Sequence, residues 1–281
     1  MMLHRTLQQI FDIFTAAMDQ SRPSDSAGHR ITSWLHQSAA LRKIARRVCH
    51  GWTLRQSFHG GVICHDAVEH SWAWTGAFRY ASFDRELQEK LLLLSRDHEM
   101  LLDLGCNVGA MLLSVTLRNP AIKALGVDPN CRAVELLNKS IAANHLSHRA
   151  HVIEAAVADR DGSVSFDETG SVAGHVSASG RAVASVDFAR LVNEHSQAQK
   201  CLVKIDIEGF ETVLLDQLSR LKFRKNLCLV IELHSLGFNQ AGDPQRCMRA
   251  LLESGAKVMD LRDCPITGVA EDQITQVQAV W

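Results

Sequence analysis

One charged run stands out for its capacity to do chemistry: Lys204, Asp206 and Glu208 alternate with Ile205 and Ile207. In a strand, this alternation places the charged side chains on one side and the isoleucines on the other. Charged groups at the end of a buried strand are unfavourable unless they serve one another or a ligand. The run therefore predicts a ligand site, and the alternative is an ion-pair network in which Lys204 neutralises Asp206.

A histidine ends the next strongly apolar segment. Glu232 and His234 also share one side of their predicted strand, and His234 comes directly after Leu233. An imidazole titrates near neutral pH, so His234 is a candidate general base. A purely structural role for this histidine is the alternative.

A glycine-rich turn follows an earlier apolar segment. Gly105 and Gly109 allow the backbone to approach a ligand closely, and Asn107 tolerates a positive φ better than most residues. The free backbone N–H groups of the helix expected after this turn suit a carboxylate or a phosphate. The G-x-x-x-G spacing differs from the G-x-G-x-x-G of dinucleotide folds, which disfavours a nicotinamide cofactor. A plain tight turn is the structural alternative.

Asp128 ends the second predicted strand, nineteen residues after Gly109. A carboxylate in this place can accept hydrogen bonds from both hydroxyls of a ribose. The alternative is an acid at the start of the helix that leads to Arg132. Together, the glycine turn and the acid at the strand end predict a nucleoside-containing cofactor.

The elements that must position these residues alternate along the chain. Apolar segments predict strands over Met100–Leu104, Ala124–Val127, His151–Ala156, Gly162–Phe166, Cys201–Ile207, Leu227–Leu233, Lys257–Leu261 and Thr275–Trp281. Helical spacing of apolar residues predicts helices over Ser82–Leu94, Ala110–Leu117, Arg132–Asn144, Val186–Val192, Thr212–Leu221 and Pro244–Glu253. Alternation of this kind predicts an α/β fold with a doubly wound, mostly parallel, Rossmann-like sheet. The last two strands have no helix between them, so they are expected to pair antiparallel at the sheet edge, as in class I methyltransferases.

Composition limits the possible classes of protein. The 281 residues are 46% hydrophobic and 22% charged, with a net charge of −1, so a general electrostatic grip on nucleic acid is not indicated. No run of about 18 apolar residues is present, and no membrane span is expected. The eight cysteines are scattered without a C-x-x-C pair, which predicts reduced thiols, a cytoplasmic protein and no zinc site. Residues 1–95 read as a mainly helical extension that caps the site or recognises the acceptor, ahead of a catalytic domain over residues 96–281.

The motifs resemble the FkbM family of S-adenosylmethionine-dependent methyltransferases over residues 100–235. The matching segments are Asp103–Gly109, Gly126–Pro129, Ala155–Asp159 with Asp161-Gly162, Ser185–Asp187, Lys204–Glu211 and Val230–His234. The sequence departs from the family pattern at Cys106, where alanine is usual, and at Val186, where leucine is usual.

The resemblance implies methyl transfer from S-adenosylmethionine to a hydroxyl on a sugar or a secondary metabolite. It implies that Asp103 and the turn formed by Gly105, Cys106, Asn107 and Gly109 hold the methionine part of the cofactor. It also implies that Asp128 binds the ribose, and that Ala156 and Asp159 border the adenine.

The acceptor hydroxyl must lose a proton during transfer. The candidate acceptors of this proton are Asp206, Glu208 and His234, in that order. The expected partner is a small-molecule or glycan acceptor, and no nucleic acid is expected. Two other functions stay open: a non-catalytic nucleoside-binding scaffold, and a nicotinamide-dependent oxidoreductase, which the glycine spacing disfavours.

Overall fold

The computed structural model describes residues 51–66, 80–167, 175–176, 180–240 and 242–281. The chain divides into two compact units, Met1–Phe83 and Asp84–Trp281. The helices predicted for the first fifty residues lie outside the described residues.

The described part of the first unit is a β-hairpin. Strands β1 (Thr53–Phe58) and β2 (Gly61–Asp66) pair antiparallel. His59 and Gly60 join them, both at positive φ (46° and 83°), as a two-residue hairpin turn requires. A short 3₁₀ helix, η2 (Tyr80–Ser82), follows later in the chain, and the Tyr80 amide donates to Gln56 Oε1 at 2.8 Å.

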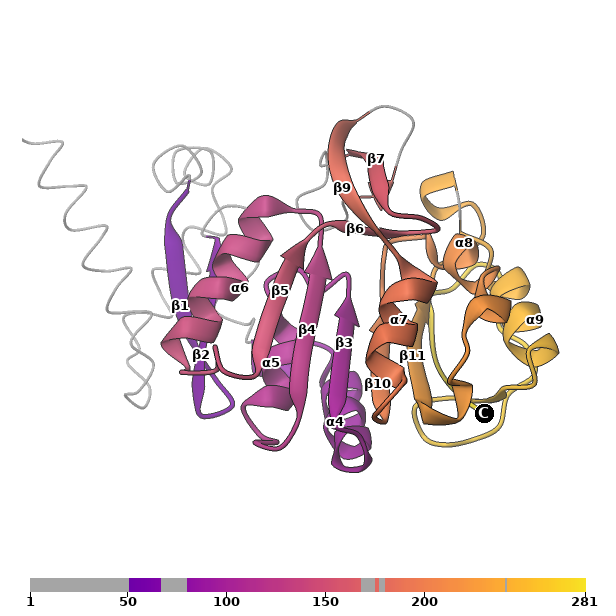
Figure 1. The fold of residues 1–281 in the computed structure, drawn as a ribbon, viewed down its shortest axis with the longest axis horizontal. Coiled ribbons are helices and arrows are strands. Elements are labelled where there is room, and N and C mark those ends of the chain that lie inside the picture. Colours follow the sequence, from indigo (N-terminus) through magenta and orange to yellow (C-terminus); the bar gives the residue numbers. More distant parts are fainter. Residues whose placement is uncertain (1–50, 67–79, 168–174, 177–179, 241) are drawn as a thin grey trace, which may run out of the picture. The chain divides into compact units, whose positions relative to one another are not determined.

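The second unit is built on a mixed sheet. Within the described residues, seven strands lie in the order β12-β13-β11-β10-β3-β4-β5 (Figure 1). Five of them are parallel to one another: β3 (Met100–Leu104), β4 (Lys123–Asp128), β5 (Ala150–Glu154), β10 (Cys201–Ile205) and β11 (Leu227–Leu233). Strand β13 (Thr275–Val280) pairs antiparallel both with β11 and with the edge strand β12 (Lys257–Met259), so β12 runs in the direction of the other five and β13 alone in this described sheet runs against them. The predicted doubly wound sheet and the antiparallel pairing of its last two strands at one edge are confirmed.

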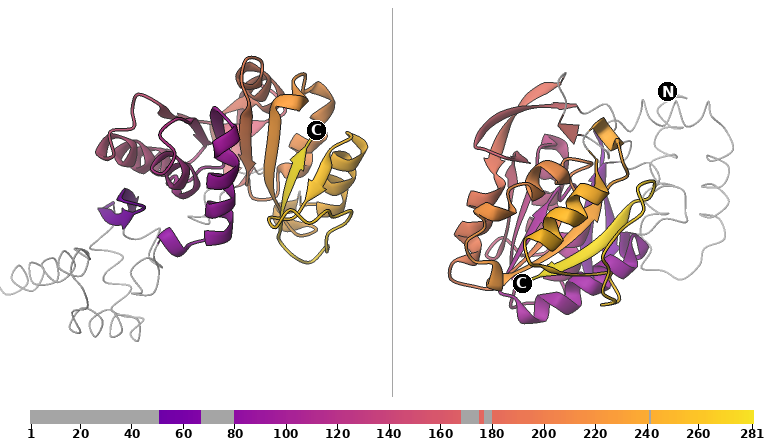
Figure 2. Two further views of the ribbon diagram at one scale, coloured as in Figure 1. Left: turned by 90° about the horizontal axis from the view of Figure 1, so that it is seen from below. Right: turned by 90° about the vertical axis from the view of Figure 1, so that its right-hand side faces the viewer.

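Helices cover both faces of this sheet (Figure 2, left). The α-helices are α4 (Arg85–Leu94), α5 (Ala110–Thr116), α6 (Cys131–Ala143), α7 (Phe188–Ser196), α8 (Glu211–Leu215) and α9 (Pro244–Glu253). The 3₁₀ helices are η3 (Ser95–Asp97), η4 (Leu218–Arg220), η5 (Arg224–Asn226) and η6 (Phe238–Gln240).

The order of the strands determines which face of the sheet each helix covers. The chain moves from β3 outward to β4 and β5, then returns to β10 and moves outward the other way. Because parallel crossovers are right-handed, α5 and α6 lie on one face and the helices after β5 on the other. Apolar residues of β3, β10 and β11 pack with those of α7, α8 and α9 in one core, including Leu102, Phe188 and Leu251, which are fully buried.

A second, smaller sheet adjoins the end of β5. Its strands are β6 (Ala156–Ala158), β7 (Gly162–Asp167), β8 (His175–Val176) and β9 (Arg181–Asp187), in the order β6-β9-β7-β8 (Figure 1). The sequence analysis predicted β7 but missed β9, and it placed the start of the following helix inside β9. The helix begins only at Phe188, because Asp187 caps it by accepting from the Arg190 amide at 2.8 Å.

None of the helices in the described part of the chain is long and apolar enough to cross a membrane.

Candidate active site

The predicted site residues gather where β3 and β10 lie side by side. Asp103 and Leu104 of β3 pair in register with Lys204 and Ile205 of β10. From these two strands the chain winds outward in opposite directions, so this is the point at which the strand order reverses. Ligands of doubly wound sheets bind beyond the carboxyl ends of the strands at such a point.

The glycine turn after β3 packs directly on the segment after β10. Gly105, Asn107 and Gly109 have φ values of 77°, 47° and 83°, as the sequence predicted for residues that tolerate a positive φ. A Cβ at Gly105 would overlap the carbonyl oxygen of Asp206, and one at Gly109 would overlap Leu137. The Asp206 amide in turn donates to Leu104 O at 3.0 Å. The turn therefore requires glycine at residue 105 for both conformation and space.

Cys106 faces the neighbouring strand β4. A Cβ at Gly126 would lie 2.7 Å from Cys106 Sγ, so the thiol occupies the space that this glycine leaves. Burial raises the pKa of the Cys106 thiol well above its usual range, and the nearby carboxylate of Asp128 acts in the same direction. Cys106 is thus a neutral packing residue in this arrangement.

Asp128 joins the end of β4 to the glycine turn. Its Oδ2 accepts from the Asn107 amide at 2.7 Å, and its Oδ1 accepts from the Asn130 amide at 2.9 Å. Burial raises the pKa of Asp128 to about 6, although the hydrogen bonds from Asn130 and Asn107 lower it. The carboxylate is held in one orientation at the strand end where a ribose was predicted to bind.

Asp103 and Lys204 form a buried charge cluster beneath this turn. Lys204 Nζ lies 3.4 Å from Asp103 Oδ1 and 3.1 Å from Asp206 Oδ2, and it donates to Gly105 O at 3.2 Å. Burial lowers the pKa of Lys204, but the carboxylates of Asp206 and Asp103 outweigh burial and raise it. Burial raises the pKa of Asp103, whose Oδ2 accepts from the Leu112 amide at 3.0 Å. The ion pair between Lys204 and Asp206 that the sequence suggested is present, and it is shared with Asp103.

His234 lies at the centre of a second cluster. Its Nε2 is 3.5 Å from Glu208 Oε2 and 4.0 Å from Asp206 Oδ1, and its ring stacks on Phe238 at 4.6 Å. Burial lowers the pKa of His234, but Glu208 and Glu211 outweigh burial and raise it to about 10. The three residues proposed from sequence for proton transfer, Asp206, Glu208 and His234, are therefore neighbours.

Glu211 is a member of this cluster that the sequence analysis did not select. Its Oε1 accepts from the amides of Ile207 and Gly209 at 2.9 and 3.2 Å, and it lies 3.2 Å from His234 Nδ1. One carboxylate therefore holds the loop after β10 by hydrogen bonds and lies at ion-pair distance from the imidazole. The loop needs this support because Glu208 and Gly209 have φ values of 56° and 99°.

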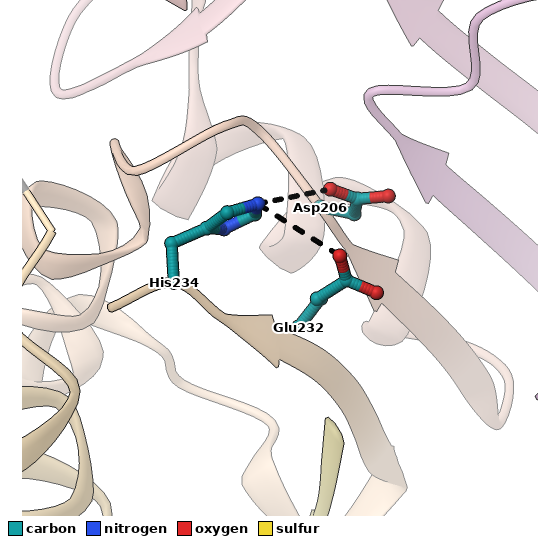
Figure 3. A group of neighbouring side chains, drawn as sticks. All are labelled: Asp206, Glu232 and His234. Carbon is teal, nitrogen blue, oxygen red and sulfur yellow. Dashed lines mark ion pairs between the residues drawn. The ribbon is translucent and has the colours of Figure 1, made fainter. Parts of the chain in front are cut away.

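Glu232 is a second member of this cluster that the sequence analysis did not select as a catalytic residue. Its Oε1 lies 3.8 Å from His234 Nε2, and its Oε2 accepts from Gln276 Nε2 at 2.8 Å. Burial raises the pKa of Glu232, and the Asp206 carboxylate acts in the same direction. Asp206, Glu232 and His234 point toward one another (Figure 3), with one potential ligand atom from each lying within 4.8 Å of the others. The sequence indicated that Glu232 lies beside His234, because the two residues share one side of their predicted strand.

Ala156 and Asp159, expected to border the adenine, lie beyond β5. The Ala155 amide donates to Asp128 O at 3.1 Å, which brings the start of β6 next to the end of β4. Ala156 is buried, whereas Asp159 is exposed and its carbonyl accepts from Arg220 Nη1 at 3.1 Å. Ala156 thus follows a residue that is hydrogen-bonded to Asp128, and Asp159 is tied to Arg220 through its backbone.

Comparison with known proteins identifies one family model. Residues 72–168 match the model described as methyltransferase small domain. No curated protein sequence matches the chain significantly.

Similar solved structures include an O-methyltransferase family protein from Burkholderia thailandensis (12% identity, TM-score 0.46, 76% of this chain and 59% of that one). They also include a putative O-methyltransferase from Nostoc punctiforme (12%, 0.44, 77% and 61%) and M. jannaschii TYW2 in complex with AdoMet (11%, 0.44, 81% and 84%). The chain spans less than two thirds of the first two proteins, and likeness at these TM-scores carries no argument about its activity.

The family match covers the glycine turn, Asp128 and the strands that carry them. The sheet has the class I arrangement, in which one antiparallel strand, β13, lies between the parallel strands β11 and β12 near one edge. Residues 84–281 therefore have the Rossmann-like fold of class I methyltransferases, whose methyl donor is S-adenosylmethionine.

Proposed function

We propose that the protein transfers a methyl group from S-adenosylmethionine to a hydroxyl oxygen of a small-molecule or glycan acceptor, as a member of the FkbM family. The observation that carries this proposal is the position of Lys204. Its ammonium group contacts both the glycine turn, through Gly105 O, and the carboxylate of Asp206. The predicted cofactor-binding turn and the predicted proton acceptor are thus held together at the point where the strand order reverses.

The hydrogen-bonding groups at the turn and at Asp128 fit a nucleoside cofactor. Each oxygen of Asp128 accepts one backbone N–H, and a carboxylate oxygen can accept a second hydrogen bond, so both can still receive a ribose hydroxyl. Asp103 and the turn Gly105–Gly109 would hold the methionine part, and Ala156 and Asp159 would border the adenine. When bound, the cofactor supplies a methyl group on a positively charged sulfur, which keeps the electron pair of the broken carbon–sulfur bond.

Proton removal falls to the cluster after β10. The side chains of Asp206 and Glu208 are 27% and 25% exposed, whereas that of His234 is 2% exposed and faces carboxylates at both nitrogens. Asp206 and Glu208 are therefore the first candidates to receive the hydroxyl proton, and His234 comes last because its raised pKa keeps the ring protonated near neutral pH. A positioned acceptor of this kind contributes about 10²–10⁴-fold to the rate, and alignment of the two reactants contributes the larger share.

The substitution Asp206→Asn tests this assignment. It keeps the shape of the side chain but removes its charge, so we expect turnover to fall by roughly 100-fold or more. Affinity for S-adenosylmethionine should stay within several-fold, because Asp128 and the glycine turn are unchanged. Asp216→Asn, which alters an exposed aspartate paired with Arg246, is the matched control and should behave as wild type.

The measurement is transfer of labelled methyl groups to a panel of small metabolites and glycans, read by mass spectrometry, with cofactor affinity from calorimetry. Near-normal turnover of Asp206→Asn would remove this residue from the mechanism. Methylation of carbon or nitrogen in the products would contradict O-methylation. Binding of a nicotinamide cofactor in place of S-adenosylmethionine, or cofactor binding without transfer to any acceptor, would favour the two other functions considered from sequence.

A further inference from the structure

Three potential metal ligands come from the ends of two neighbouring strands. Glu232 and His234 come from the end of β11 and just beyond it, and Asp206 comes directly after β10. His234 Nε2 lies 3.8 Å from Glu232 Oε1 and 4.0 Å from Asp206 Oδ1 (Figure 3). These distances are longer than the roughly 2.7–3.2 Å of an ordinary hydrogen bond.

The spacing suits ligands around a shared ion. Atoms bonded at about 2.1 Å to one ion lie roughly 3 to 4.3 Å from one another. The three donor atoms meet this condition approximately, since they lie within 4.8 Å of one another. The two carboxylates are only partly buried, which leaves them room to turn toward a shared ion.

The histidine has a carboxylate beside its second ring nitrogen. The Nδ1 of His234 faces Glu211 Oε1 at 3.2 Å, and Glu211 is itself held by the amides of Ile207 and Gly209. A metal-binding histidine commonly donates its other ring N–H to a carboxylate, which fixes the tautomer and leaves the free nitrogen toward the ion. Here the ring is nearly fully buried, and its Nε2 is directed at Asp206 and Glu232, so an ion bound there would take the place of the Nε2 proton.

The surrounding charges also favour a cation. Lys204 is shared between Asp103 and Asp206, so its single charge does not neutralise both carboxylates. Glu208, Glu211 and Glu232 add three further carboxylates around His234. A divalent ion among them would reduce the repulsion that this concentration of negative charge creates.

We propose that Asp206, Glu232 and His234 bind a divalent transition-metal ion, with Glu211 as the residue that positions His234. Two carboxylates and one imidazole form a mixed oxygen and nitrogen set, which suits Mn²⁺ or Zn²⁺ better than Mg²⁺ or Ca²⁺. Three protein ligands leave positions open for water or for an acceptor oxygen, whose proton the ion would make easier to remove. This last role rests on the proposed function, whereas binding of the ion does not.

With Asp206 as a metal ligand, Glu208 would take the proton. Its Oε2 lies 3.5 Å from His234 Nε2, so it is next to the proposed ion without being needed as a ligand. The metal site therefore places Glu208 ahead of Asp206 as the proton acceptor and leaves the set of candidate residues unchanged.

The test is binding of Mn²⁺ to the full chain after treatment with a chelator, measured by the loss of the free-ion signal in electron paramagnetic resonance and by calorimetry. We expect one ion per chain, displaced by Zn²⁺. Glu232→Gln keeps an oxygen that can accept from Gln276, so it should fold, and its affinity for Mn²⁺ should fall by at least ~10-fold. Glu211→Gln should also weaken binding by ~10-fold or more through the orientation of His234.

Glu135→Gln is the matched control, because this exposed glutamate of α6 pairs only at the surface with Arg132 and Lys139. It should bind Mn²⁺ as wild type does. Absence of stoichiometric binding of Mn²⁺ and Zn²⁺ to the wild type, or equal affinity in Glu232→Gln, would overturn the proposal. Titration with S-adenosylmethionine in the presence of chelator tests the proposed function separately, so failure of one proposal does not imply failure of the other.

Discussion

At the scale of single residues, burial controls the ionisation of the carboxylate that was predicted to bind the ribose. Asp128 is 7% exposed, and its pKa is raised to about 6 although two amides donate to it. The nearby charges of Lys204 and Asp103 act in opposite directions, lowering and raising this pKa respectively. Protonation of Asp128 therefore falls close to the neutral range.

Affinity for S-adenosylmethionine should depend on pH through Asp128. Protonation removes one acceptor for the ribose hydroxyls, so affinity should decrease as pH falls through about 6. The contribution of Asp128 to the stability of the fold changes with pH in the opposite direction. A raised pKa stabilises the folded chain below the usual value of 3.8, and that stabilisation is lost as pH rises through about 6.

Calorimetric titrations between pH 7.5 and pH 5 would check this prediction. Asp128→Asn should bind more weakly at pH 7.5 and lose most of the pH dependence, because the amide does not titrate. Wild-type affinity that is constant over this interval would show that Asp128 does not bind the cofactor as a carboxylate.

At the scale of elements, the strands were predicted well because buried parallel strands consist of apolar runs that end at polar residues. Met100–Leu104, Leu227–Leu233 and the helix Pro244–Glu253 agree with the structure residue by residue. Strand β9 was missed because its alternating residues are small, and Val183 is the only large apolar residue among its most buried positions.

The loop after β10 limited prediction of the site. The sequence pattern extended this strand to Ile207, but the strand ends at Ile205 and the backbone turns through the positive φ of Glu208. That turn directs Glu208 toward His234 and lets Glu211 accept from the loop amides. Strand alternation cannot show this contact, because it depends on a conformation that few non-glycine residues adopt.

Replacement of Gly105 by alanine tests the close packing of the glycine turn. Both Gly105→Ala and Gly255→Ala place a Cβ at a positive φ, of 77° and 84°, which carries roughly 1–2 kcal/mol of strain. Only at Gly105 does the new Cβ overlap another backbone group, the carbonyl of Asp206, whereas nothing lies within 4 Å at Gly255.

We expect Gly105→Ala to lower affinity for S-adenosylmethionine by more than ~10-fold, since the turn must move away from β10. Gly255→Ala should retain wild-type affinity despite similar strain. Thermal unfolding would be measured alongside calorimetry to separate loss of the site from loss of the fold. Equal affinities in the two variants would contradict the assignment of the turn to the cofactor.

At the scale of the whole molecule, the chain is organised as two units with separate internal packing. The residues assigned to the cofactor and to proton transfer, from Asp103 to His234, all belong to the second unit. The alternation of predicted strands and helices predicted the class of fold, whereas no Pro- or Gly-rich linker before α4 marks the division at Phe83–Asp84 in the sequence. A role of the N-terminal residues in recognising the acceptor is a proposal.

A fragment of residues 84–281 should therefore bind S-adenosylmethionine with an affinity within several-fold of the full chain. Calorimetry on the fragment, with circular dichroism to show that it is folded, checks this prediction. A folded fragment that has lost cofactor affinity would show that residues before Asp84 complete the pocket.

The contact between Gly105 and the Asp206 carbonyl has a consequence for protein engineering. These two segments touch through main-chain atoms, so side-chain replacement cannot separate them without rebuilding both. Directed evolution toward new products should accordingly succeed at positions away from this main-chain contact, such as the exposed Leu236 beyond β11. Libraries randomised at Gly105 and Asp206 themselves should yield mostly inactive variants.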